Sequence, residues 1–135
     1  MKIIVCLDDF GGMTFNHRRQ SRDRVVVADI ISMLDGSPLY IDEYSAPLFA
    51  GSEVDVRVVE DIVNDVPRGE YCFVENRAVS LFSGIEEVVI YRWNRVYPRD
   101  LCFDISLDAD GFKLSSAVDF EGYSHEKISK EIFAK

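Results

Sequence analysis

The order of apolar segments constrains the fold of this chain most. The chain opens with a short strand pattern, KIIVCL, that is apolar on both faces and is typical of a buried central strand. The next apolar run, RVVVADIISML, predicts a helix, because Val26, Ile30 and Leu34 recur at helical spacing. Ser21 is the predicted N-cap of this helix, and the residues DGSP are its stop signal.

Helical segments are predicted only up to about residue 84, and the C-terminal third of the chain is predicted to consist of strands. Strands are predicted for PLYI, VDVRVV, EYCFVEN, EEVVIYRWNRVY, LCFDISL, FKLSSAVDF and HEKISKEIFAK. Short helical turns are predicted for DIVNDVPRG and RAVSLFSG, and SAPLF reads as a loop or short helix. Alternating strands and helices favour parallel pairing, whereas successive strands favour antiparallel pairing. We therefore expect an α/β fold, a three-layer sandwich with a mixed sheet, in a single domain over residues 1–135.

The charge and the cysteines restrict the partners and the compartment. The net charge is −9, so the surface should repel nucleic acids and anionic membranes in general. Three widely spaced cysteines, Cys6, Cys72 and Cys102, form no metal-binding pattern and read as reduced thiols in a cytoplasmic protein. The apolar run at the start is too short for a signal peptide or a membrane helix.

A basic segment, FNHRRQSRDR, stands out against this acidic background. Its arginines would recognise a phosphate or carboxylate through their forked donors, and its neutral polar residues would add hydrogen bonds. The candidate anion-binding residues are Asn16, His17, Arg18, Arg19, Gln20, Ser21, Arg22 and Arg24. The same arginines would also serve to neutralise nearby carboxylates, and the sequence leaves both readings open.

Carboxylates follow four of the predicted strands. These are Asp8 and Asp9, Asp42 and Glu43, Glu60 and Asp61, and Glu75. If the strands are parallel, these side chains rim the crevice where open α/β sheets bind ligands. Such a rim disfavours the phosphates of a dinucleotide. It also suggests a Mg²⁺ site built from Asp8, Asp9, Asp42 and Glu43, although solvation and ion pairing explain the same acids.

The order of elements resembles that of dihydrofolate reductase over nearly the whole chain. The similar segments are KIIVCLDDFGGMTFNHRRQSRDR, DGSPLYIDEYSAPLF, DVPRGEYCFVEN and the C-terminal strands, which include GFKLSS and the final hairpin. The resemblance implies that Asp23 corresponds to the carboxylate at the start of the family's first helix, a catalytic residue. Its neighbours Arg22 and Arg24 favour the ionised form of Asp23, which argues against a proton donor at neutral pH.

The cofactor motifs of that family have no counterpart here. Residues 42–45, Asp-Glu-Tyr-Ser, stand where the family has Gly-Arg-x-Thr, and Glu75-Asn76 stands where it has Gly-Gly. Arg18, Arg19 and Gln20 replace the family's Leu-Pro-Trp. We therefore expect NADPH not to bind.

Three functions follow in order of preference. The first is a dihydrofolate-reductase-like domain without a working NADPH site, which binds a small anionic ligand or a protein partner through the basic segment. The second is a Mg²⁺-assisted phosphoryl or phosphodiester enzyme that uses the acidic rim. The third is an active NADPH-dependent pteridine reductase. The late strands EVVIYRW and KISKEIFAK would also allow a homodimer if they lie at a sheet edge, with Tyr91 and Trp93 in the contact.

Overall fold

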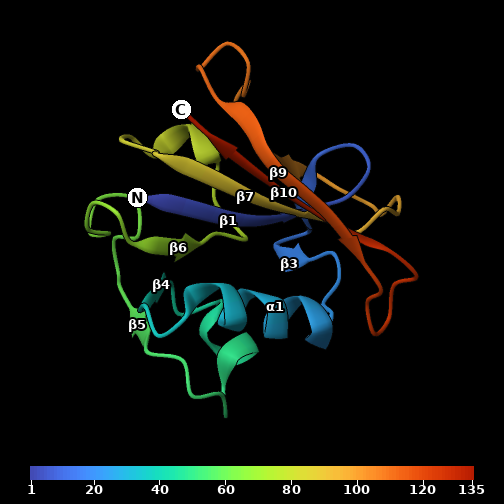
Figure 1. The fold of residues 1–135 in the computed structure, drawn as a ribbon, viewed down its shortest axis with the longest axis horizontal. Coiled ribbons are helices and arrows are strands. Elements are labelled where there is room, and N and C mark those ends of the chain that lie inside the picture. The colour runs from blue at the N-terminus through green and yellow to red at the C-terminus, as the bar shows by residue number, and fades with distance from the viewer.

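The computed structural model describes residues 1–135, which form two sheets and three helical segments (Figure 1). The strands are β1 (Lys2–Leu7), β2 (Gly12–Phe15), β3 (Arg18–Arg19), β4 (Leu39–Ile41), β5 (Val56–Val58), β6 (Tyr71–Phe73), β7 (Glu87–Arg92), β8 (Leu101–Cys102), β9 (Lys113–Phe120) and β10 (Ile128–Ala134). The helices are α1 (Arg24–Leu34) and the 3-10 segments η1 (Ala46–Phe49) and η2 (Val79–Leu81).

The large sheet is mixed, as the sequence predicts. Its seven strands lie in the order β5-β4-β6-β1-β7-β10-β9. The five strands from β5 to β7 are parallel, β10 runs antiparallel to β7, and β9 pairs antiparallel with β10. The expected α/β fold class, with a parallel N-terminal half and antiparallel C-terminal strands, is confirmed.

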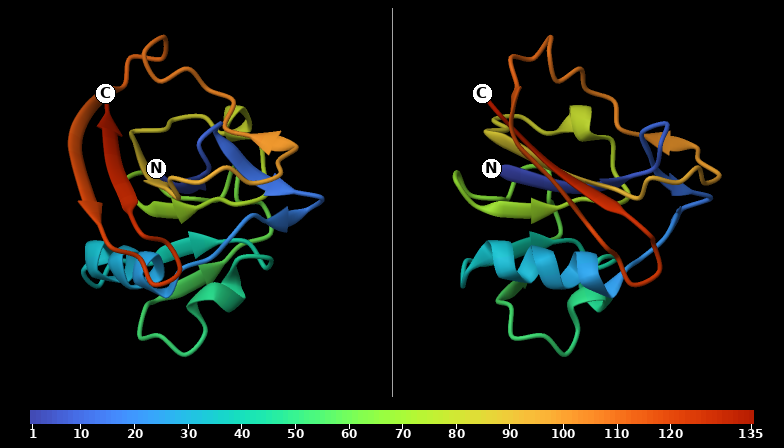
Figure 2. Two further views of the ribbon diagram at one scale, coloured as in Figure 1. Left: turned by 90° about the vertical axis from the view of Figure 1, so that its right-hand side faces the viewer. Right: turned by 45° about the vertical axis from the view of Figure 1, so that its right-hand side comes forward.

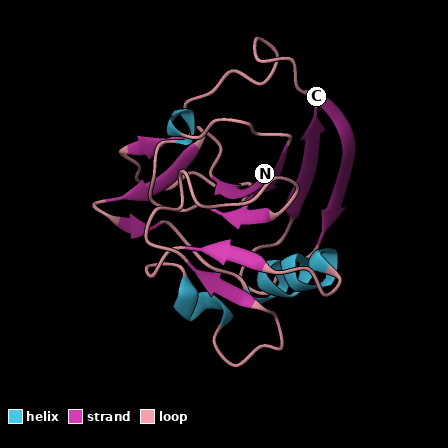
Figure 3. Ribbon diagram, turned by 90° about the vertical axis from the view of Figure 1, so that its left-hand side faces the viewer, coloured by secondary structure: helices cyan, strands magenta, loops and turns pink.

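Two apolar clusters cover the two faces of this sheet. One cluster packs the buried face of α1 and Phe49 of η1 against β1, β4, β6 and β7. The other packs Val79 of η2 and the long connections between strands against the opposite face. Figure 3 shows α1 and η1 together on one side of the molecule and η2 apart from them. The face of the sheet opposite α1 is thus covered by loops and short turns rather than by long helices.

The N-cap of helix α1 lies two residues later in the chain than predicted. Asp23, not Ser21, is the N-cap: its backbone is extended, and its carboxylate accepts a hydrogen bond from the N–H of Val25. The buried side chains of the helix are Val26, Ile30 and Leu34, as their spacing predicts. The helix ends where Asp35 and Gly36 adopt left-handed backbone conformations.

The first part of the basic segment, residues 15–19, belongs to a β-hairpin rather than to a loop. Strands β2 and β3 pair through Thr14 with Arg19 and through Phe15 with Arg18. Asn16 and His17 form the turn, and both have positive φ angles, of 51° and 63°. Hairpin turns with two left-handed residues follow the twist of the flanking strands. Strand β8 pairs with β2 and completes a three-stranded sheet.

The two strands that were expected at a sheet edge lie inside the large sheet. Strand β7 lies between β1 and β10, and β10 lies between β7 and β9, so the proposed basis for a homodimer is wrong. Tyr91 and Trp93 are buried. The edges of the large sheet are β5 and β9, and the homodimer itself stays a prediction.

Several short elements also differ from expectation. The segment DIVNDVPRG contains turns but no helix, and only a single 3-10 turn forms in RAVSLFSG. Cys6, Cys72 and Cys102 are free thiols on β1, β6 and β8. None of the helices combines the length and the apolar character needed to span a lipid bilayer.

Candidate anion-binding site

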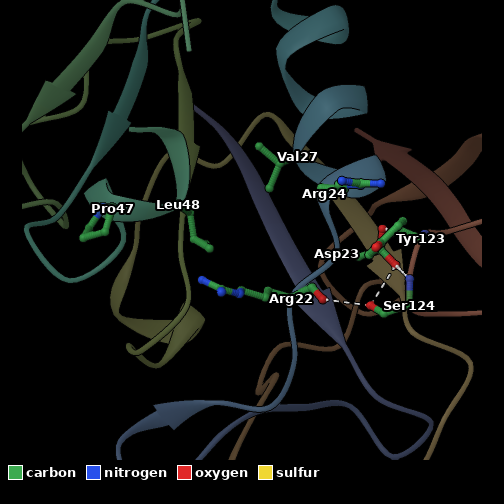
Figure 4. A pocket seen from close by; sticks show the side chains of 8 residues that line it. All are labelled: Arg22, Asp23, Arg24, Val27, Pro47, Leu48, Tyr123 and Ser124. Atoms are coloured by element: carbon green, nitrogen blue, oxygen red, sulfur yellow. Dashed lines mark hydrogen bonds between the residues drawn. The ribbon is translucent and has the colours of Figure 1, made fainter. Parts of the chain in front are cut away.

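A cavity of about 420 Å³ lies between the start of α1, η1 and the turn that joins β9 to β10 (Figure 4). It is lined by Arg22, Asp23, Arg24, Val27, Pro47, Leu48, Tyr123 and Ser124. The side chain of Arg22 reaches across it toward Leu48 in Figure 4. The lining therefore combines an apolar wall with cationic groups at the helix start.

The two arginines of this cavity form no ion pair with a carboxylate. Arg22 is exposed, and only its backbone carbonyl is engaged, by the hydroxyl of Ser124. The guanidinium of Arg24 lies 3.6 Å from the ring centroid of Tyr123, which is a cation–π contact. Such a contact holds the side chain but leaves its positive charge uncompensated.

Asp23 is fully buried beneath these arginines, and donors surround its carboxylate. Its oxygens accept hydrogen bonds from the backbone N–H groups of Val25, Tyr123 and Ser124, at 2.8 to 2.9 Å. Nδ1 of His125 lies 2.9 Å from Oδ2. Burial alone would raise the pKa of Asp23, but these hydrogen bonds outweigh it and hold the pKa far below the usual range. The carboxylate is thus ionised at neutral pH and is not a proton donor.

His125 connects this carboxylate to two hydroxyl groups. Its Nε2 lies 2.8 Å from the hydroxyl of Tyr97 and 3.2 Å from that of Ser21. Its ring stacks on Trp93, with centroids 4.6 Å apart. Because an ionised carboxylate only accepts hydrogen bonds, Nδ1 carries a proton, and when the ring is neutral Nε2 is the acceptor.

The turn between β9 and β10 is fixed tightly over the start of α1. Figure 2 shows this turn beside the helix start, although more than eighty residues separate the two in sequence. A Cβ atom on Gly122 would lie 2.7 Å from Oδ2 of Asp23, so the close approach requires glycine. The turn supplies Tyr123, Ser124 and His125, which the sequence did not indicate as site residues.

Arg19 lies on the other side of this region and is neutralised. Its guanidinium forms a bidentate pair with Glu75, with Nε–Oε2 and Nη2–Oε1 distances of 2.9 and 3.0 Å. The hydroxyl of Ser45 also donates a hydrogen bond to the carboxylate of Glu75, at 2.8 Å. The hydroxyl of Tyr44 accepts a hydrogen bond from the backbone N–H of Arg19. Of the two roles predicted for these arginines, Arg19 therefore has the second: it neutralises a carboxylate, that of Glu75.

The other acids of the predicted rim lie apart. Asp8 is buried and accepts hydrogen bonds from the N–H groups of Phe10, Gly12 and Tyr97, and these lower its pKa against the effect of burial. Asp42 caps the N–H of Ser45, and Asp9 and Glu43 are exposed. No three acidic, histidine or cysteine side chains come close enough to hold a metal ion. The hypothesis of a Mg²⁺ site at Asp8, Asp9, Asp42 and Glu43 thus has no ligand group to rest on.

The remaining candidate residues are divided between two places. Asn16, His17 and Arg18 lie at the exposed end of the hairpin, away from the cavity. The side-chain amide of Gln20 donates to the carboxylate of Asp8. Of the predicted anion-binding residues, Arg22 and Arg24 line the cavity, and Ser21 lies beside it.

Comparisons with known proteins establish the fold and nothing finer. No protein-family model and no curated protein matches this chain. Among solved structures, the chain is similar to dihydrofolate reductase from Enterococcus faecalis complexed with NADP(H) and RAB-propyl. The match covers 98% of this chain and 94% of that one, with a TM-score of 0.64 and 8% sequence identity. This chain therefore has a dihydrofolate-reductase-like fold.

Proposed function

We propose that this protein binds a small anionic ligand in the cavity between α1 and η1 and has no working site for a nicotinamide dinucleotide. The carrying observation is the pair Arg22 and Arg24, two uncompensated guanidinium groups at the mouth of a cavity in a protein of net charge −9. Arginine forks bind carboxylates and phosphates with short, charge-assisted hydrogen bonds.

The apolar wall selects among anions. Val27, Pro47 and Leu48 form the apolar part of the lining, so a ligand with an apolar body beside its charged group would bury more surface than an inorganic ion. An organic carboxylate or phosphate monoester meets these requirements.

The end of β6 argues against a dinucleotide. Glu75 places a carboxylate there, and Arg19 and Ser45 hold that carboxylate in position. The cavities that remain beside Glu75 have volumes of only about 10 and 20 Å³, which is room for water rather than for a nucleotide. A pyrophosphate at this place would meet fixed negative charge and no glycine-rich turn.

Isothermal titration calorimetry with phenyl phosphate, benzoate and NADPH tests the proposal. We expect phenyl phosphate or benzoate to bind, and Arg22→Ala to weaken that binding about 10-fold or more, because a hydrogen bond to a charged group contributes about 1.5–3 kcal/mol. Arg68→Ala is the matched control, since it removes an equally charged side chain that is 95% exposed and does not line the cavity.

Two results would overturn the proposal. One is tight binding of NADPH, which would restore the reductase hypothesis. The other is binding of the organic anions that Arg22→Ala and Arg68→Ala weaken equally, which would indicate a general electrostatic effect rather than this cavity.

A further inference from the structure

A row of three side chains beside the cavity has the geometry of an activated nucleophile. The hydroxyl of Ser21 lies 3.2 Å from Nε2 of His125, and Nδ1 of the same ring lies 2.9 Å from Asp23. The ionised carboxylate fixes a proton on Nδ1, so in the neutral ring the lone pair of Nε2 is within reach of the serine hydroxyl. Hydroxyl, base and orienting carboxylate stand in the order that nucleophilic catalysis requires.

We propose that Ser21 is a nucleophile for acyl transfer, with His125 as its general base and Asp23 as a positioning residue. The substrate class is an ester of a small organic acid that carries a second, anionic group. The choice of a charged substrate rests on the proposed anion site, whereas the nucleophile itself does not depend on it.

Access to Ser21 is through the anion site. A small cavity of about 20 Å³ is lined by Ser21 and shares Arg22, Asp23, Val27 and Leu48 with the larger one. Arg22 is the exposed side chain at their junction, so its movement toward a bound anion would widen the passage. Cys6 lines the same small cavity, but burial raises the pKa of its thiol far above the usual range and keeps it protonated.

Donors for a developing oxyanion are present next to the nucleophile. The backbone N–H groups of Ser21 and Arg22 donate no hydrogen bond to another backbone group. The N–H of the residue after a nucleophile is a common oxyanion donor. These two groups are therefore available to an ester carbonyl oxygen beside Ser21.

The reaction balances with water as the second substrate. Ser21 Oγ forms a bond to the acyl carbon while its proton passes to Nε2 of His125. The carbon–oxygen bond to the alcohol then breaks, and the alcohol leaves with that proton. Water attacks the acyl-serine in the same way, which releases the acid and restores the hydroxyl of Ser21.

Tyr97 limits this activity in the structure as it stands. Its hydroxyl lies 2.8 Å from the same Nε2, closer than the hydroxyl of Ser21. A neutral imidazole nitrogen has one lone pair, so the two hydroxyls compete for it. Removing the tyrosine hydroxyl should leave Nε2 to Ser21 alone, an effect that a purely structural role of the network does not produce.

Labelling with an uncharged fluorophosphonate, followed by peptide mass spectrometry, tests the nucleophile. We expect the label on Ser21, none in Ser21→Ala, and faster labelling in Tyr97→Phe. His125→Gln should slow labelling about 100-fold or more, as expected for loss of a general base. Circular dichroism checks that each variant is folded, and Ser21→Ala and Tyr97→Phe remove only one oxygen each.

Hydrolysis of the mono-p-nitrophenyl ester of succinic acid then tests the substrate class. We expect an initial burst of p-nitrophenolate that Ser21→Ala abolishes and that Arg22→Ala slows. Absence of label from Ser21 in both the wild type and Tyr97→Phe would overturn the proposal and leave the calorimetric result for the anion site intact. Labelling of Ser21 without binding of organic anions would instead overturn the anion site and retain the nucleophile.

Discussion

Two buried carboxylates, Glu75 and Asp23, line the same small cavity but are stabilised by different means. Glu75 is paired with the guanidinium of Arg19, so charge is neutralised by charge. Asp23 is held by backbone N–H groups and by His125, and the arginines beside it take no part. The positive charge of Arg19 is therefore neutralised by Glu75, whereas the charges of Arg22 and Arg24 beside Asp23 stay available to a ligand.

Asp23→Ala should have the largest effect on stability. The substitution removes the helix cap and takes away the carboxylate that accepts from the part-buried N–H groups of Val25, Tyr123 and Ser124. We expect the free energy of unfolding to fall by about 3–5 kcal/mol, in the range for removal of one partner from a buried charged network. Urea denaturation measures the loss.

Asp9→Ala is the control for this substitution, because Asp9 is an exposed aspartate. It lies next to Asp8, which is as deeply buried as Asp23. Its free energy of unfolding should differ from that of the wild type by no more than about 0.5 kcal/mol. A loss of less than about 1 kcal/mol in Asp23→Ala would show that water replaces the carboxylate and that the turn is not anchored by it.

Arg19→Ala tests the other half of the comparison. It leaves Glu75 buried without its cationic partner, which costs about 2 kcal/mol once the 24% exposure of the Arg19 side chain is allowed for. The double variant Arg19→Met with Glu75→Leu removes both charges, and we expect it to recover most of the loss. If the double variant is as unstable as Arg19→Ala, packing of the hairpin rather than charge pairing determines the stability.

The periodicity of apolar residues predicts much of this fold, because β1, α1 and β7 bury the apolar residues that the sequence marks directly, whereas β9 is exposed along almost its whole length. The hairpin β2–β3 escapes prediction, since Asn16-His17 replaces the Asn-Gly signal and the strands are only four and two residues long. β7 and β10 read as edge candidates because sequence does not encode strand order.

The candidate site is predictable only in the half that is contiguous in sequence. Arg22, Asp23 and Arg24 are adjacent, so their charge pattern is visible. His125 reaches Asp23 across 102 positions of the chain, and no local pattern encodes that contact. The sequence left two roles open for the arginines of the basic segment, anion binding and neutralisation of a carboxylate. Among these arginines, only Arg19 pairs with a carboxylate in the structure.

The pH dependence of stability separates the two carboxylates further. The pKa of Asp23 is far below its value of about 3.9 in the unfolded chain, so the unfolded state binds a proton first as the pH falls. The stabilisation is complete above about pH 4–5 and is lost as the pH decreases below that range. Between pH 5 and pH 3 we expect Asp23 to account for about 1 kcal/mol of lost stability.

Asp23→Asn provides the comparison, because asparagine is also a good N-cap but does not titrate. Its free energy of unfolding should fall less steeply between pH 5 and pH 3 than that of the wild type. Asp8, whose pKa is also lowered, contributes to the acid sensitivity of both proteins and cancels in the difference. Equal slopes in the two proteins would contradict the ionised, hydrogen-bonded state of Asp23.

Arg22→Ala should have the smallest effect on stability, and this makes the comparison with Arg19 informative. Both substitutions remove one arginine from the same short segment, but the side chain of Arg22 pairs with no carboxylate and is exposed. We expect a change of at most about 0.5 kcal/mol in the free energy of unfolding. A slight gain in stability is consistent with the same physics, because Arg22 lies near Arg24 and like charges repel. Thermal denaturation with phenyl phosphate then adds the functional contrast: a ligand that binds the folded state raises the melting temperature of the wild type and of Arg19→Ala by similar amounts, and that of Arg22→Ala by less. An arginine that can be removed without cost to folding, yet not without loss of ligand stabilisation, is one that the fold leaves free for binding.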